Sequence, residues 1–115
     1  MQFPRFELPD PSIFEQQFGA EVDPSDVWSY HVKMPLDEGQ SMEISLDASM
    51  GSVSIRWKVI DRTVISIYRE RIEKVEVDPK GYVTCTGETD SILFRLSIGL
   101  YPVEFLDSLM SECSD

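Results

Sequence analysis

Two neighbouring segments alternate apolar and polar residues without a break, and this pattern constrains the fold more than any other feature of the sequence. Residues 42–47 (MEISLD) and 53–59 (VSIRWKV) place an apolar side chain at every second position, which is the period of a β-strand. A single antiparallel register matches apolar residues on one face and opposite charges on the other. The sequence therefore predicts a hairpin with the pairs Met42–Trp57, Ile44–Ile55, Leu46–Val53 and Glu43–Arg56.

The segments that follow predict further strands joined by tight turns. The chain is expected to turn near 61–63, near 69–71 and at 78–81, where proline presets φ and Gly81 takes the left-handed conformation. Alternating apolar residues predict another strand at 91–98. The expected pairs are Ile65 with Val59, Ile67 with Trp57, Val75 with Cys85 and Val77 with Val83.

The N-terminal segment differs from the centre of the chain. Four prolines divide residues 1–27, and Asp10 and Gly19 are a good N-cap and a good terminator for a short helix between them. Phe14 and Phe18 would share one face of that helix. We expect this face to pack onto the domain; the alternative is a mobile arm that docks on a partner. Asp23-Pro24-Ser25-Asp26 predicts a tight turn, and a strand is expected at 27–34.

Residues 103–110 fit two patterns. Their apolar residues follow a helical stripe, while Val103 and Phe105 also fit a short strand. A short C-terminal helix is the preferred prediction, followed by a polar tail at 111–115.

These elements predict one mainly β domain. We expect an antiparallel meander of seven or eight strands that forms a sandwich or a strongly curved sheet, with short helices near the N- and C-termini. The expected divisions are an N-terminal arm at 1–27, a β domain at 28–110 and a tail at 111–115. The predicted core comprises Trp28, Ile44, Leu46, Val53, Ile55, Trp57, Ile65, Ile67, Val75, Val77, Val83, Phe94, Leu96 and Ile98.

The charge of the chain is strongly negative and unevenly distributed. It carries 21 acidic and 10 basic residues, for a net charge of −11. Residues 1–50 contribute −8 (ten acids, two bases), 51–80 contribute +2 (five acids, seven bases) and 81–115 contribute −5 (six acids, one base). Direct nucleic-acid binding is not expected of such a chain, whereas a basic protein partner is. Alternatively, the acids serve solubility alone.

The sequence contains no apolar run of about 18 residues, the length that marks a membrane-spanning helix, and its N-terminus lacks the pattern of a signal peptide. We therefore expect a cytoplasmic protein. Cys85 and Cys113 are expected to be free thiols.

Catalytic and metal-binding patterns are weak. The single histidine, His31, would need Cys85 or a serine beside it to form a catalytic dyad, and a surface role is preferred. One histidine and two distant cysteines do not form a zinc motif, and the spacing of a calcium loop is absent. We therefore expect neither an enzyme nor a metal or cofactor site. Trp28 and Tyr30 would become candidate partner anchors if they proved to be exposed.

The acidic loops are the strongest indication of function. Carboxylates without an expected partner on a neighbouring strand cluster in three segments, and the candidate partner-binding residues are Asp23, Asp26, Asp37, Glu38, Glu88 and Asp90. In size, charge and lack of catalytic groups, the chain resembles the small acidic immunity proteins that neutralise bacterial toxins. The resemblance implies a bacterial inhibitor that occludes a basic toxin or nuclease. The alternatives are a self-associating structural or accessory subunit, for example a homodimer, and an enzyme or small-ligand binder with an apolar pocket between sheet and helix.

Overall fold

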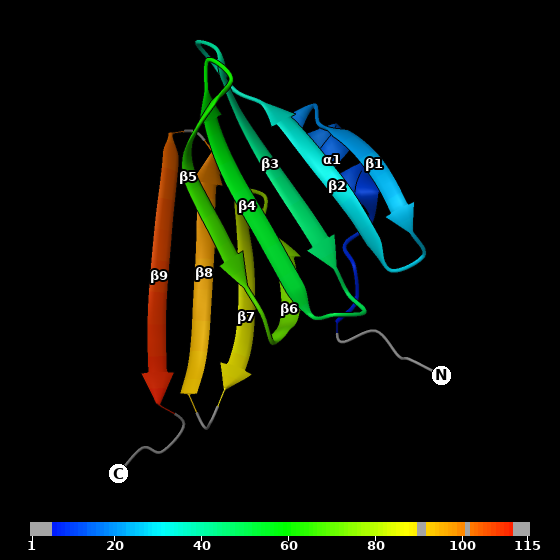
Figure 1. The fold of residues 1–115 in the computed structure, drawn as a ribbon, viewed down its shortest axis with the longest axis vertical. Helices are drawn as coiled ribbons and strands as arrows, with labels where there is room; N and C mark the ends of the chain where they lie inside the picture. Colours follow the sequence, from blue (N-terminus) through cyan, green and yellow to red (C-terminus); the bar gives the residue numbers. More distant parts are fainter. Residues whose placement is uncertain (1–5, 90–91, 101, 112–115) are drawn as a thin grey trace.

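The computed structural model describes residues 6–89, 92–100 and 102–111, which form one helix, nine strands and two antiparallel sheets (Figure 1). The prediction of a mainly β, antiparallel fold is confirmed, with more strands and fewer helices than expected. The helix is α1 (Pro11–Phe18). The first sheet contains, in order, β1 (Glu21–Asp26), β2 (Ser29–Pro35), β3 (Gln40–Asp47), β4 (Ser52–Val59) and β5 (Arg62–Arg69). The second contains β6 (Ile72–Val77), β7 (Tyr82–Thr89), β8 (Ile92–Leu100) and β9 (Val103–Ser111).

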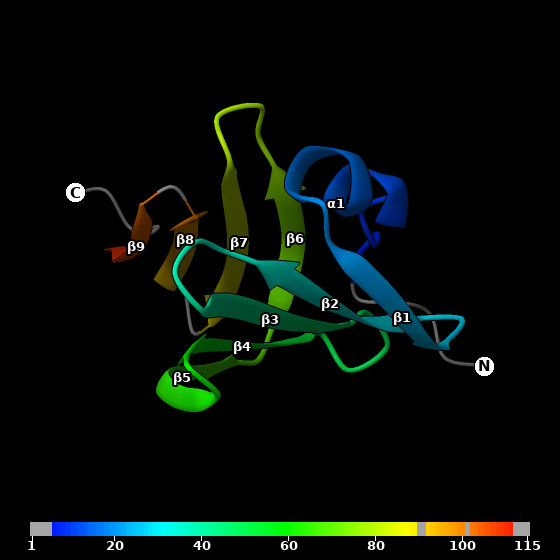
Figure 2. The same cartoon turned by 90° about the horizontal axis from the view of Figure 1, so that it is seen from above.

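The meander divides into two sheets where the chain passes from β5 to β6. Arg71 has a positive φ of 59° at this point, and the amide of Ile72 donates to the carbonyl of Gly51 at 2.8 Å. Strands remain in chain order within each sheet, so the up-and-down connections are confirmed. Seen from above, the two sheets lie on either side of a shared interior, and α1 lies beside β1 and β6 (Figure 2). An ion pair of 2.7 Å between Arg69 and Asp107 links β5 to β9.

The predicted hairpin registers are largely confirmed. All four pairs expected between β3 and β4 are present, as are both pairs expected between β6 and β7. The predicted register between β4 and β5 is wrong, because Ile65 pairs with Trp57 and Ile67 pairs with Ile55. The turn consists of Ile60 and Asp61, both with positive φ (49° and 60°), and a bulge follows on the strands. A tighter turn than expected thus moves each pair by two residues.

Helix α1 has the predicted boundaries. The Asp10 side chain accepts a hydrogen bond from the Ser12 amide at 3.0 Å, and Gly19 ends the helix with a φ of 62°. Phe14 and Phe18 are buried, and the Phe14 ring meets Tyr30 edge-on at 6.1 Å. The helix therefore packs onto the domain as expected.

Both ends of the β domain differ from the prediction. Residues 21–26 form strand β1 and not a turn, since Pro24 lies on an edge strand where it does not interrupt the sheet. Residues 103–111 form β9 and not a helix, because β8 offers them a full-length antiparallel partner. Leu106, which the helical pattern would bury, is 50% exposed. Cys113 and residues 112–115 of the expected tail lie outside the described residues.

The hydrophobic core draws on both sheets and the helix. Nine of the fourteen predicted core residues are buried there: Ile44, Leu46, Val53, Ile55, Val75, Val83, Phe94, Leu96 and Ile98. The prediction that Trp28 belongs to the core is wrong, because this residue lies in the β1–β2 turn and is 41% exposed. Trp57, Ile67 and Val77 are only half-buried and pack at the margin of the core, and Ile65 is half-buried. Tyr30 is buried, and its hydroxyl donates to the carbonyl of Pro9 at 2.6 Å.

Candidate functional site

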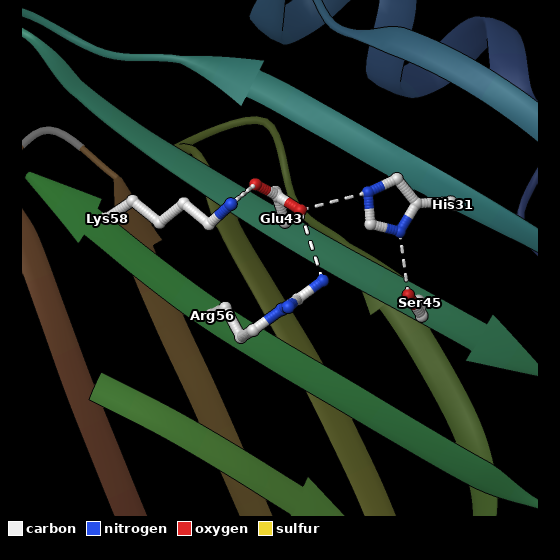
Figure 3. Close-up of polar contacts among 5 residues, drawn as sticks. All are labelled: His31, Glu43, Ser45, Arg56 and Lys58. Atoms are coloured by element: carbon white, nitrogen blue, oxygen red, sulfur yellow. Dashed lines mark hydrogen bonds and ion pairs between the residues drawn. The ribbon is translucent and has the colours of Figure 1, made fainter. Parts of the chain in front are cut away.

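A charged cluster occupies the outer face of the five-stranded sheet (Figure 3). Glu43 on β3 is only 7% exposed, although it points away from the core. Its Oε2 lies 2.8 Å from Nζ of Lys58, and its Oε1 lies 3.3 Å from both the Arg56 guanidinium and Nε2 of His31. The hydrogen bond from Lys58 lowers the pKa of Glu43, the nearby charges of Lys58, Arg56 and His31 add to this effect, and burial opposes it. The Glu43 carboxylate on β3 therefore connects to β2 through His31 and to β4 through Arg56 and Lys58.

Strand register places these groups together. Lys33, Glu43 and Arg56 occupy one row across β2, β3 and β4, and His31 and Ser45 occupy the next. Alternation sends all five side chains to the outer face, opposite the core residues. The middle of this face thus holds more cations than acids, although the chain as a whole is acidic.

The cluster also contains a serine–histidine pair. Nδ1 of His31 lies 2.7 Å from Oγ of Ser45, so the serine that a dyad needs is present. Three features argue against nucleophilic catalysis. Glu43 is shared with Lys58 and Arg56, β3 lies between two hydrogen-bonded strands so that its amides are engaged in the sheet, and the pair lines none of four cavities formed by the described residues. These contacts instead hold the side chains of neighbouring strands together on the outer face of the sheet.

A second feature is a groove at one end of the molecule, where the β2–β3 turn approaches the β8–β9 connection. It encloses about 520 Å³. We call it the end groove, and its lining residues are Leu36, Asp37, Glu38, Gln40, Trp57, Leu100, Pro102 and Val103. Its walls are mostly apolar, and the Trp57 indole is held in place by a 3.2 Å hydrogen bond to Oε1 of Gln40 and by the Phe105 ring at 6.4 Å.

The turn that carries the two acids of the end groove is well ordered by hydrogen bonds. The amide of Gln40 donates to the carbonyl of Asp37 at 3.2 Å, and the amide of Ile60 donates to the carbonyl of Gly39 at 2.9 Å. Glu38 and Gly39 both have positive φ, 60° and 75°. For glutamate this conformation costs about 1–2 kcal/mol, so the position is held by its surroundings.

The six predicted partner-binding acids do not form a single site. Asp37 and Glu38 lie at the end groove and are exposed. Glu88 pairs with Leu93 near the opposite end of the second sheet, about 23 Å from the groove at about 3.3 Å per residue of strand. The others belong to the first sheet or lie beyond the description: Asp23 is exposed on β1, Asp26 ends β1, and Asp90 lies outside the described residues.

Sequence reasoning missed the cationic middle of the sheet face and the apolar walls of the end groove. The first had a usable signal, since Lys33, Arg56 and Lys58 all alternate with core residues. The second had none, because Trp57 and Val103 are brought together only by the packing of the two sheets.

Among the described residues, no group of three or more histidine, cysteine, aspartate or glutamate side chains is arranged to hold a metal ion. No helix in that part of the chain is long and apolar enough to span a membrane.

The fold and site define a two-sheet antiparallel β protein with an open, charged sheet face and a groove at one end that carries two exposed acids. No protein-family model matches the chain, and no curated protein matches its sequence. A similar solved structure is described as a contact-dependent growth inhibition toxin–immunity protein complex from Klebsiella pneumoniae 342. The TM-score is 0.74 at 15% sequence identity, and the match covers 96% of this chain and 100% of the chain in that complex. At this identity the likeness establishes a shared fold.

Proposed function

We propose that the chain is an immunity-type inhibitor that binds a protein toxin and blocks it by occlusion. The observation that carries the proposal is the structural likeness to a chain of a toxin–immunity complex over the full length of that chain. The absence of a nucleophile with oxyanion donors beside a cavity, within the described residues, favours binding over catalysis.

The distribution of charge supports a basic toxin or nuclease as the partner. The chain carries −11 in net charge, and exposed carboxylates lie at the β1 edge and at the end groove. A negative field accelerates encounter with a basic protein and weakens as salt is added. A cytoplasmic location would place the inhibitor where such a toxin acts.

The proposal is tested in two stages. Tagged protein is used to capture partners from cells that encode the chain, at low and high salt, and the captured protein is identified by mass spectrometry. The partner is then expressed in a heterologous bacterium with and without this chain. The proposal is supported if the partner alone arrests growth and co-expression of this chain restores growth. A partner that does not arrest growth, or an arrest that co-expression of this chain does not relieve, would refute it.

A self-associating subunit is the second candidate, and β5 is the feature that favours it. This strand is an edge of the first sheet, and Val64 and Tyr68 on it are 54% and 55% exposed. An unpaired edge with apolar side chains can add a strand from a second copy. Sedimentation at micromolar concentration should then show a dimer that Val64→Lys dissociates. A monomer would exclude this candidate.

A further inference from the structure

We propose that the end groove receives an arginine side chain from the toxin partner. This inference rests on the proposed function and deepens it by assigning the chemistry of one contact. Apolar walls and exposed carboxylates occur together in this groove, and an arginine side chain combines an aliphatic stem with a cationic head.

The walls of the groove suit the stem and the plane of the guanidinium. Leu36, Leu100 and Val103 supply aliphatic surface, and their packing against the core fixes its shape. The Trp57 indole donates a hydrogen bond to Gln40 and contacts the Phe105 ring, and it offers a flat ring against which a guanidinium can stack. The enclosed volume of about 520 Å³ falls within the range of about 300–1,000 Å³ typical of ligand sites.

The two carboxylates supply the charge that the head requires. Asp37 and Glu38 are exposed at the groove, and no cation of the described residues forms an ion pair with either of them. Glu43, by contrast, already holds three cationic or titratable partners and is buried, so it is not exposed to a further cation. The acids of the groove are thus the ones available to a guanidinium, which can bond two carboxylate oxygens at once.

The turn that carries these carboxylates has a backbone that is ordered before any partner binds. Its hydrogen bonds to Gln40 and Ile60 fix the backbone, and the positive φ of Glu38 is maintained at a cost in stability. A site that is ordered before binding loses less entropy when it binds.

The first experiment uses blocked amino acids as probes of the isolated protein. N-acetyl-arginine methylamide is titrated into the ¹⁵N-labelled chain, and the indole N–H signal of Trp57 is followed by NMR. We expect saturable shifts with a Kd of about 1–10 mM, which corresponds to about 3–4 kcal/mol of binding free energy. The citrulline analogue, which has the same shape without the charge, should bind at least about fivefold more weakly. Equal binding of both probes, or no shift of the indole signal, would overturn the proposal.

Matched variants locate the binding. Asp37→Asn/Glu38→Gln should weaken the arginine probe at least about fivefold, in keeping with the loss of two charge-assisted contacts. Glu70→Gln/Glu73→Gln removes the same net charge from exposed positions just beyond the Arg69 end of β5, at the opposite end of the first sheet from the groove, and should change the Kd less than twofold. Equal losses in the two variants would mean general electrostatic attraction and would also overturn the proposal.

The captured toxin separates this inference from the proposed function. If the chain neutralises the toxin and Asp37→Asn/Glu38→Gln raises the Kd of that complex at least tenfold, both are supported. If neutralisation persists and the double variant binds the toxin as tightly as the unmodified chain, the groove assignment fails while the function stands. If the chain neutralises no captured toxin but the arginine probe binds at the groove, the proposed function fails and the groove remains a site for a basic side chain of another protein, so its assignment to a toxin is lost.

Discussion

Replacing Glu43 by glutamine tests the charged cluster on the sheet face. The substitution preserves the volume of the side chain and removes its charge. It removes the carboxylate from the 2.8 Å ion pair with Lys58, a charge-assisted contact worth about 1.5–3 kcal/mol, and leaves the ammonium only an uncharged amide group to bond. The 3.3 Å contacts with Arg56 and His31 add less, since both partners are partly exposed to solvent. Relief of the desolvation of Glu43 offsets part of the loss, so we expect a cost of about 2 kcal/mol at pH 7.

Thermal and urea unfolding followed by circular dichroism measure this cost. At an unfolding entropy of about 2.1 cal/mol/K per residue, 2 kcal/mol lowers the Tm by about 8 °C. Glu76→Gln is the control, because its 3.5 Å ion pair with Lys74 is well exposed and should contribute less than about 0.5 kcal/mol.

The pH dependence supplies a second check. The pKa of Glu43 is lower in the folded protein than its ordinary value of 4.5, so the stabilisation is fully present above pH 4.5. It is lost as the pH falls through the folded pKa, where the native carboxylate takes up a proton. The stability difference between the native chain and Glu43→Gln should therefore shrink below pH 4.5. A stability difference below about 0.5 kcal/mol at pH 7, which is typical of an exposed ion pair, would refute the argument. A stability difference that stays constant down to pH 3 would also refute it.

Three further predictions concern single residues. Glu38→Gly should raise the free energy of unfolding by about 0.5–1 kcal/mol, because glycine adopts the φ of 60° without strain, and urea denaturation measures it. Gly87→Ala should destabilise by about 3 kcal/mol or more in the same assay, because a Cβ there would meet the carbonyl oxygen of Arg71 and the ring of Phe94; a change below 1 kcal/mol would contradict this geometry. Burial raises the pKa of Cys85 to about 12, so in a Cys113→Ser background the native protein should react with a disulfide reagent at pH 8 only at its rate of unfolding.

The sequence predicted best where two faces of a strand agreed on one register. The β3–β4 hairpin is such a case, because a shift by one residue would have exposed Ile44 and Ile55 and separated Glu43 from Arg56. The boundaries of α1 were equally accessible, since Asp10 and Gly19 act through their own backbone neighbours. Local chemistry was sufficient in both cases.

The errors occurred where a distant strand decides the structure. Residues 103–111 carry a pattern that fits helix and strand alike, and pairing with β8 determines the outcome. Pro24 and its neighbouring acids suggested a turn, yet a proline is tolerated at an edge, and β2 pairs with the segment as β1. The predicted burial of Trp28 was wrong for a related reason, because β2 begins at Ser29 and leaves the indole in the turn.

The distribution of charge explains why the acidic candidates lie in separate parts of the fold. Net charge is a sum over the chain, whereas a binding site depends on where strand ends and turns place each carboxylate. Here alternation gathers Lys33, Arg56 and Lys58 around Glu43 in the middle of the first sheet, which leaves little negative potential there. The exposed acids of the β2–β3 turn have no such neighbours among the described residues. A basic partner is therefore expected to approach the end of the molecule that carries the groove, and not the open face of the sheet.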